Sequence, residues 1–205
     1  ASPAGSAPQP VHRLRQHEGA VVALSLSPDG SIIASMGQEL KLVFVDTSNM
    51  GQITQIPLNA IIPVTDRIGG VFLGPRVQDN KRRNSHRVHV ALVTSSQLLL
   101  FQLDPYAGQL HQTKTNLAPF QRSLTIGKFT TNGDFFILGS EAGDIALVDT
   151  IHGTVVTSAR VCSGGVRDIA VSGSLVHNDA IPDDGSTGNS NSGGAGGGSN
   201  PDGGG

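Results

Sequence analysis

A basic cluster holds the densest group of chemically active side chains in the sequence. It consists of Lys81, Arg82, Arg83 and Arg87, and it encloses Ser85. Neighbouring lysines and arginines bind phosphate or acidic partners, serve as nuclear import signals, and place a serine in reach of kinases that prefer upstream arginines. The cluster therefore predicts a partner-binding site with Ser85 as a phosphorylation site. The alternative is a solvated loop insertion between two strands.

Histidines and a single cysteine are the other candidates for catalysis or metal binding. His86 and His89 are near enough in sequence to share a ligand, but no histidine pair has the i, i+4 spacing of a zinc hydrolase. Cys162 is alone, which excludes an intramolecular disulfide and a cysteine-cluster metal site. The chain contains neither a Gly-x-Ser-x-Gly nucleophile motif nor a phosphate-binding loop. We therefore predict a protein that is not an enzyme, with no catalytic residue, cofactor or metal.

Composition limits the part of the chain that can fold. Residues 1–11 are rich in Pro, Ala and Ser, and residues 182–205 are rich in Gly, Ser and Asn. Such segments bury too little apolar surface to offset the entropy lost on ordering. We expect a disordered N-terminal segment at 1–11, a folded unit at 12–181, and a disordered linker or loop at 182–205.

Charge and hydropathy restrict the partners. Lysine and arginine number 14 against 16 acidic residues, which gives a net charge of −2 with histidine neutral. A protein that coats nucleic acid needs a clearly basic face, so no nucleic-acid partner is expected. The basic cluster leaves an RNA- or ribosome-associated role open as an alternative.

No apolar run approaches the roughly 20 residues that cross a bilayer. A cytoplasmic location is therefore expected.

Short apolar runs separated by turn residues fill the region between Val11 and Ile181. No helical period lasts for three turns, and evenly spaced short strands are typical of an all-β sandwich or propeller. The runs form three groups of four predicted strands: Ala20–Leu26, Ser31–Ser35, Lys41–Val45 and Gln52–Pro57; Gly70–Leu73, Arg87–Thr94, Leu98–Leu103 and Gln109–Thr113; Ser123–Phe129, Asp134–Leu138, Asp144–Val148 and Thr154–Ala159.

Internal repetition favours the propeller. Residues 23–53, ALSLSPDGSIIASMGQELKLVFVDTSNMGQI, align with residues 126–156, IGKFTTNGDFFILGSEAGDIALVDTIHGTVV. The Asp-Gly and Asn-Gly pairs suit tight turns, because glycine accepts positive φ without strain. Gly30 and Gly133 lie about 100 residues apart, which is the length of two blades of about 40–50 residues.

The opening of the first repeat resembles a WD repeat. In that family a histidine precedes the first strand, an SPDG turn follows it, and the third strand ends in Trp-Asp. Here the histidine is His17, and Val-Asp, Leu-Asp and Val-Asp close the third strands of the three groups, at Asp46, Asp104 and Asp149. The chain has no tryptophan, so the buried network of histidine, serine, aspartate and tryptophan that the family uses is incomplete.

Two residues correspond to what remains of that network. They are His17 and Ser35, and Gln38-Glu39 stand where the family has an aspartate. The resemblance covers residues 12 to 171. It implies an all-β, partial WD-repeat-like β-propeller with about three blades and the start of a fourth at 165–171.

A closed seven-blade ring needs about 280–315 residues at this repeat length. We therefore expect a segment of a larger protein that binds other proteins, with the remaining blades supplied by the parent chain or by another subunit.

The order of the pieces is also similar to the divergent propeller of the endoplasmic-reticulum exchange factors for the Sar GTPase, which start COPII coat assembly in vesicle transport. The similar pieces are residues 17–42, GGVFLGP at 69–75 before a polar insertion, and GGVRDIAVSG at 164–173. This resemblance implies a small GTPase as partner, guanine nucleotide exchange as activity, and a place at the cytosolic face of the endoplasmic reticulum. The family's cation-binding loop and membrane anchor have no match in these residues, so no functional residue is carried over.

Overall fold

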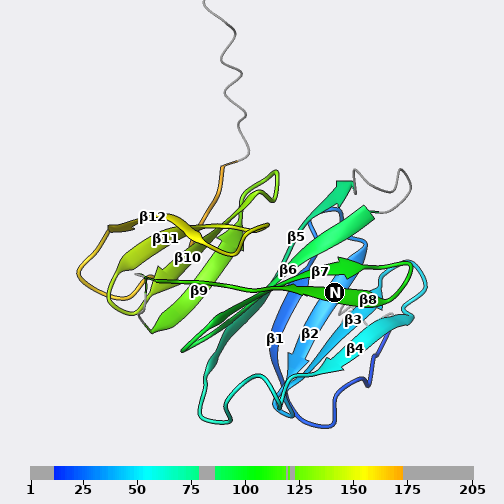
Figure 1. Cartoon of the computed structure of the whole chain (residues 1–205). Coiled ribbons are helices and arrows are strands. Elements are labelled where there is room, and N and C mark those ends of the chain that lie inside the picture. Colours follow the sequence, from blue (N-terminus) through cyan, green and yellow to red (C-terminus); the bar gives the residue numbers. More distant parts are fainter. Residues whose placement is uncertain (1–11, 79–85, 119, 121–122, 173–205) are drawn as a thin grey trace, which may run out of the picture. The chain divides into compact units, whose positions relative to one another are not determined.

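A computed structural model describes residues 12–78, 86–118, 120 and 123–172 of the chain. Within these residues the chain forms twelve β-strands and no helix (Figure 1). The all-β prediction is confirmed, and a strand lies at each of the twelve predicted places. The segments predicted to be disordered, 1–11 and 182–205, lie outside the described residues, as do Lys81, Arg82, Arg83 and Ser85.

The strands form three antiparallel sheets of four, each a simple meander that we call a blade. Blade 1 contains β1 (Val21–Leu26), β2 (Ile32–Gly37), β3 (Lys41–Asp46) and β4 (Gln52–Pro57). Blade 2 contains β5 (Ile68–Gln78), β6 (His86–Thr94), β7 (Leu98–Asp104) and β8 (Gln109–Thr113). Blade 3 contains β9 (Leu124–Phe129), β10 (Phe135–Ser140), β11 (Asp144–Asp149) and β12 (Val155–Arg160).

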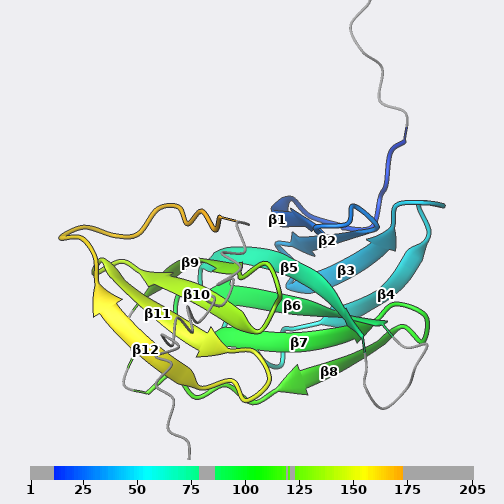
Figure 2. The same cartoon turned by 90° about the horizontal axis from the view of Figure 1, so that it is seen from above.

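The first strands of successive blades lie side by side, β1 beside β5 and β5 beside β9 (Figure 2). Each blade therefore has a near face, turned toward the preceding blade, and a far face, turned toward the following one. Side chains alternate between the two faces along a strand. In β3 the residues Leu42 and Phe44 point to the far face, whereas Val43 and Val45 point to the near face, and all four are buried.

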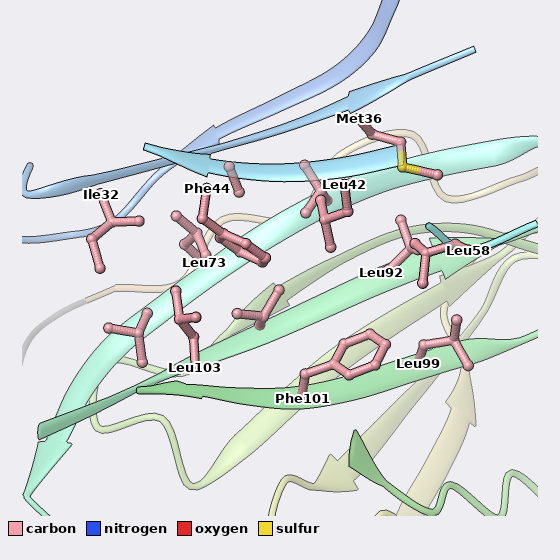
Figure 3. Close-up of a cluster of buried hydrophobic side chains, with 14 of the residues drawn as sticks. Ile32, Met36, Leu42, Phe44, Leu58, Leu73, Leu92, Leu99, Phe101 and Leu103 are labelled. Carbon is pink, nitrogen blue, oxygen red and sulfur yellow. The ribbon is translucent and has the colours of Figure 1, made fainter. Parts of the chain in front are cut away.

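Two apolar clusters join the blades. The first lies between the far face of blade 1 and the near face of blade 2, where Phe44 packs among side chains such as Leu73 and Phe101 (Figure 3). The second joins the far face of blade 2 to the near face of blade 3. There Phe136 lies 4.8 Å from Phe129 and 5.8 Å from Phe72, measured between ring centroids. Because these clusters lie between sheets, strands two and three of a blade must be apolar on both faces.

Strand β5 is longer than predicted. The predicted strand was Gly70–Leu73, but the observed strand runs from Ile68 to Gln78 and continues through Pro75. The pairing with β6 shifts register between Leu73 and Arg76, which marks a bulge at the proline. Proline is tolerated there because β5 is the edge strand of its sheet and a bulge does not need the missing N–H.

Residues 165–171, where the sequence predicts the start of a fourth blade, form no strand. Val166 is nevertheless buried, its N–H donates to Ser140 O at 2.9 Å, and its carbonyl accepts from Thr125 Oγ1 at 2.8 Å. A ladder requires the second strand of the same blade, and the described residues contain no such strand.

The turn between strands three and four gives a direct stability prediction. Met50 has φ of 55°, and the corresponding turns of blades 2 and 3 hold Gly108 at 62° and Gly153 at 68°. Methionine is strained in this left-handed region and glycine is not. We expect Met50→Gly to raise the free energy of unfolding by about 0.5–1 kcal/mol in urea titrations. Met50→Ala is the control, and an equal gain from alanine would show that relief of backbone strain is not the cause.

Candidate functional site

The structure describes the flanks of the basic cluster. Gln78 at the end of β5 pairs with His86 at the start of β6, so the cluster connects the paired ends of a hairpin. Of the basic cluster, the structure describes Arg87. This residue is half-buried in β6, and its Nη1 donates to Gln102 Oε1 on β7 at 3.0 Å. Arg87 is thus held within the sheet by a contact across strands.

The histidine and serine that match the WD-repeat network are bonded as that resemblance implies. The Nδ1 atom of His17 lies 2.7 Å from Glu39 Oε1, and its Nε2 lies 2.8 Å from Ser35 Oγ. With the proton on Nδ1, the ring donates to the carboxylate and accepts from the hydroxyl. The backbone N–H of Glu39 and the bond from His17 keep the pKa of Glu39 below its usual value, although desolvation opposes this.

A serine, a histidine and a carboxylate in this order resemble a hydrolase triad, but the surroundings of the serine favour a structural role. Ser35 lies in the middle of β2, paired with Leu24 on one side and Val43 on the other, and is 8% exposed. Its own backbone groups are committed to the sheet, whereas an acyl-transfer site needs free N–H donors around the reacting oxyanion. We call this hydrogen-bonded group a clasp, because it connects the segment before β1 to β2 and to the β2–β3 turn.

Clasps occupy the same place in the other two blades with different residues. In blade 2, Asp66 precedes β5 and accepts a bond from Thr94 Oγ1 at 2.7 Å, together with bonds from Ser95 and Ser96 in the β6–β7 turn. Burial raises the pKa of Asp66, but these hydroxyl donors outweigh it and the pKa lies below the usual value.

In blade 3 the clasp also reaches the neighbouring blade. Glu141 in the β10–β11 turn pairs with Arg67 of blade 2, and Ser123, which precedes β9, donates to the same carboxylate. Bonds from Arg67 and Ser123 lower the pKa of Glu141. Sequence reasoning missed Asp66 and Glu141. For Glu141 the available signal was its place in the repeat, next to the position that aligns with Glu39, whereas Asp66 stands in the segment before β5, where blade 1 has His17.

The aspartates at the Trp-Asp positions close the turns between strands three and four. Asp46 Oδ1 accepts the N–H of Ser48 at 2.7 Å, and Asp149 Oδ1 accepts two backbone N–H groups at 2.8 Å. Asp104 does the same in blade 2, with two bonds of 3.0 Å. These carboxylates therefore act as turn caps, which explains their recurrence without any catalytic role.

An ion pair bridges blades 1 and 2 at the opposite end of the first strands. Arg76 Nε lies 2.6 Å from Asp29 Oδ2, and Arg76 Nη2 donates to Ser31 Oγ at 2.6 Å. Burial raises the pKa of Asp29, but bonds from Ser27 and Ser31 and the charge of Arg76 lower it to about 2.

This pair predicts a small, acid-sensitive contribution to stability. The folded pKa of about 2 lies below the ordinary 3.8, so the contribution is full above about pH 4 and is lost as the pH falls toward 2. The side chains of Arg76 and Asp29 are 31% and 40% exposed, so solvent screening limits the effect of Arg76→Gln to about 1 kcal/mol at pH 7. Denaturant titrations at pH 7 and pH 3 would measure it. If Arg76→Gln lowered the free energy of unfolding more at pH 3 than at pH 7, the stabilising role of this ion pair would be contradicted.

Neither the other histidines nor the cysteine forms a metal site in the part of the chain that the structure describes, which holds no cluster of three or more potential ligands. His89 is 6% exposed, and its ring lies 5.9 Å from that of Phe129. Burial lowers the pKa of His89, although the charge of Asp134 opposes this. Cys162 is exposed, and its Sγ lies 2.9 Å from Gly164 O.

Two cavities adjoin the first strands. One of about 400 Å³ is lined by β1, β5 and β9 together with Asp168, Ile169 and Val171. The other, of about 370 Å³, lies on the near face of blade 1 between residues 14–17 and the sheet. The turn-cap aspartates and the clasp carboxylates are bonded within the blades and line neither of these two cavities, whereas His17 and Ser35 line the second.

Comparison with known proteins supports the fold. No protein-family profile and no curated protein sequence matches the chain. Among 790 matching chains of solved structures is the β-propeller domain of Cps50 (Swd1) from Myceliophteria thermophila. It has 19% sequence identity and a TM-score of 0.55, and the match covers 76% of this chain.

That likeness shows a β-propeller fold and nothing finer. The match covers 46% of the Swd1 chain, so this chain spans less than half the length of that solved propeller. A partial propeller of three blades is thereby confirmed. None of the described residues forms a helix that is long and apolar enough to cross a bilayer.

Proposed function

We propose that this chain is a protein–protein interaction platform, formed by a segment of a WD-repeat β-propeller within a larger protein of the cytoplasm. The observation that carries the proposal is the way the blades use their polar side chains. The clasps of His17, Asp66 and Glu141 and the three turn aspartates are bonded within the scaffold. What remains available to a partner is the set of loops and open blade surfaces. No catalytic residue, cofactor or metal forms part of this proposal.

The basic cluster is the docking element that we propose on this platform. Lys81, Arg82 and Arg83 follow β5, whose end is paired with the start of β6. A charged connection between paired strand ends suits an acidic or phosphorylated protein partner. Phosphorylation of Ser85 would add negative charge there and weaken such binding.

Charge reversal tests the docking element. The variant Lys81→Glu/Arg82→Glu/Arg83→Glu in the full parent protein should lose the proteins that crosslink to residues 81–87, as identified by mass spectrometry. The control reverses two exposed basic residues elsewhere, Lys114 and Arg160, and should keep them. An unchanged set of crosslinked proteins would contradict the docking role. Salt-dependent capture of RNA that the charge reversal abolishes would instead favour the RNA-associated alternative.

A second candidate is the propeller of a guanine nucleotide exchange factor for a Sar-type small GTPase, at the cytosolic face of the endoplasmic reticulum. The observation that favours it is the long first strand of blade 2, which contains Gly69, Gly70 and Gly74 and leads into the polar insertion. If it is correct, the parent protein accelerates nucleotide release from a Sar-type GTPase. Release at the spontaneous rate, measured with a fluorescent nucleotide, would eliminate this candidate and leave the platform proposal intact.

A further inference from the structure

A histidine is buried where blade 2 meets blade 3. His89 lies in β6 on the far face of blade 2 and is 6% exposed. Its ring lies 5.9 Å from that of Phe129 in β9, measured between ring centroids. The next residues on this face of β6, Ala91 and Val93, belong to the second apolar cluster. A side chain that can gain a charge near neutral pH thus occupies an otherwise apolar contact.

Two glycines allow the backbone to close around the His89 ring. A Cβ atom at Gly133, in the β9–β10 turn of blade 3, would lie 3.4 Å from His89 Cδ2 and 2.8 Å from Pro75 Cγ. A Cβ atom at Gly74 in β5 would lie 2.9 Å from Phe129 Cγ and 3.0 Å from His89 Cβ. The ring therefore lies between the β5–β6 hairpin and the β9–β10 turn, with little space for the water that would solvate a charge.

Asp134 in the β9–β10 turn is the charged residue that acts on the ring. Burial lowers the pKa of His89 below its usual value, because a buried charged ring would lack its hydration, and the charge of Asp134 opposes this. Among the described residues, none forms a hydrogen bond with the ring. The strands around the ring carry other charges, which bind elsewhere or point to other faces: Arg76 of β5, Arg87 of β6, Asp104 of β7 and Lys128 of β9. The contact therefore suits a neutral ring and not a charged one.

We propose that His89 is an acid-operated release for the contact between blades 2 and 3. The neutral ring packs against Phe129 beneath the β9–β10 turn. A protonated ring needs water around it, and water can reach it only when the turn moves away from the β5–β6 hairpin. That hairpin leads into the basic cluster, so the release would take away one support of the proposed docking element. The inference rests on the packing of blades 2 and 3, and its failure leaves the docking proposal standing.

The release acts in a pH range of its own. Well above pH 6.5 the ring is neutral in both the folded and the unfolded chain, so the contact contributes fully to stability. Because burial holds the folded pKa below that of the unfolded chain, this contribution is lost as the pH falls below 6.5. The pair of Asp29 and Arg76 weakens only below about pH 4. Measurements between pH 7.5 and pH 5 therefore separate the two effects.

The pH dependence of unfolding tests this release. In urea titrations between pH 7.5 and pH 5, the midpoint should fall more steeply toward acid for the wild-type chain than for His89→Gln, because glutamine is polar but takes up no proton. Groups common to both chains cancel in the difference between their profiles. His111→Gln, at an exposed histidine of β8, is the control and should keep the wild-type profile. Parallel profiles for the wild-type chain and His89→Gln would overturn the proposal.

A second variant keeps the test decisive if His89→Gln folds poorly. Asp134→Asn leaves the ring in place and removes the carboxylate that favours its charged form. The fall of the urea midpoint toward acid should then become steeper than in the wild-type chain. A midpoint that Asp134→Asn lowers equally at pH 7.5 and pH 5 would show a structural role without coupling to His89, and would contradict the release.

Amide hydrogen exchange shows where the chain opens in acid. With rates compared to intrinsic exchange at each pH, the wild-type chain should lose protection at pH 5 in the strands of blade 3, whereas β2 and β3 of blade 1 keep theirs. His89→Gln should keep blade 3 protected at pH 5. An equal loss in all three blades would show global unfolding in place of a local release, and the proposal would fail.

Discussion

Replacing Phe136 by alanine is expected to lower the free energy of unfolding by about 3–5 kcal/mol. The side chain is fully buried between blades 2 and 3. It makes an edge-to-face contact with Phe129 at 4.8 Å and a tilted contact with Phe72 at 5.8 Å. Alanine removes both aromatic contacts and leaves a cavity between two sheets, where neither blade can relax independently to fill it.

The loss should appear first in blade 3. Urea denaturation followed by circular dichroism gives the overall change, and limited proteolysis should cut between β9 and β12 earlier than it does in the wild-type chain. Tyr106→Ala is the matched aromatic control, since that side chain is 74% exposed and its loss should cost less than about 0.5 kcal/mol. A Phe136→Ala chain as stable as the Tyr106→Ala chain would mean that these two sheets do not pack together.

Replacing His17 by alanine is expected to cost about 2 kcal/mol, because it breaks two hydrogen bonds of the blade 1 clasp. The side chain of His17 is 5% exposed and that of Glu39 is 23% exposed, and Lys41 Nζ, 3.9 Å from Glu39 Oε1, would remain beside the carboxylate. The approach to β1 would then detach from the β2–β3 turn. Faster amide exchange in residues 17–22 should accompany the loss of stability.

Two further variants test whether burial and the bond to Ser35 account for the effect of His17. His152 also lies beside a carboxylate, 3.0 Å from Asp149, but it is 71% exposed. His152→Ala should therefore change stability by less than about 0.5 kcal/mol. Ser35→Ala should cost about 1 kcal/mol, because it removes one of the two bonds to His17. If Ser35 instead proved reactive toward a serine-directed phosphonate in the folded protein, the structural role would be wrong.

The strand pattern was readable from the sequence because strands two and three must be apolar on both faces. Runs such as Leu42 to Val45 leave little choice of secondary structure. The three turn aspartates were found through the resemblance to a WD repeat, and the structure shows that each caps the turn that immediately follows it. Strand β5 was misread at Pro75, because a bulge at a sheet edge removes the usual penalty of proline in a strand.

The clasps could be predicted only in part from the sequence, because they use different residue types at similar positions of the three blades. A histidine and a glutamate serve blade 1, an aspartate with three hydroxyls serves blade 2, and a glutamate with an arginine and a serine serves blade 3. Each set of bonds ties the turn between strands two and three to a segment that precedes a first strand. The resemblance to a known repeat pointed to His17, but no single motif covers Asp66 and Glu141.

Amide hydrogen exchange followed by mass spectrometry tests the central claim, that the chain is built of three consecutive four-stranded blades. In each blade strands two and three pair on both sides, whereas the fourth strand is an open edge. We expect slow exchange in β2, β3, β6, β7, β10 and β11 and faster exchange in β4, β8 and β12, with the same order in every blade. Fourth strands that exchange as slowly as their neighbours would mean that the sheets continue past those edges, and the three-blade architecture would be contradicted.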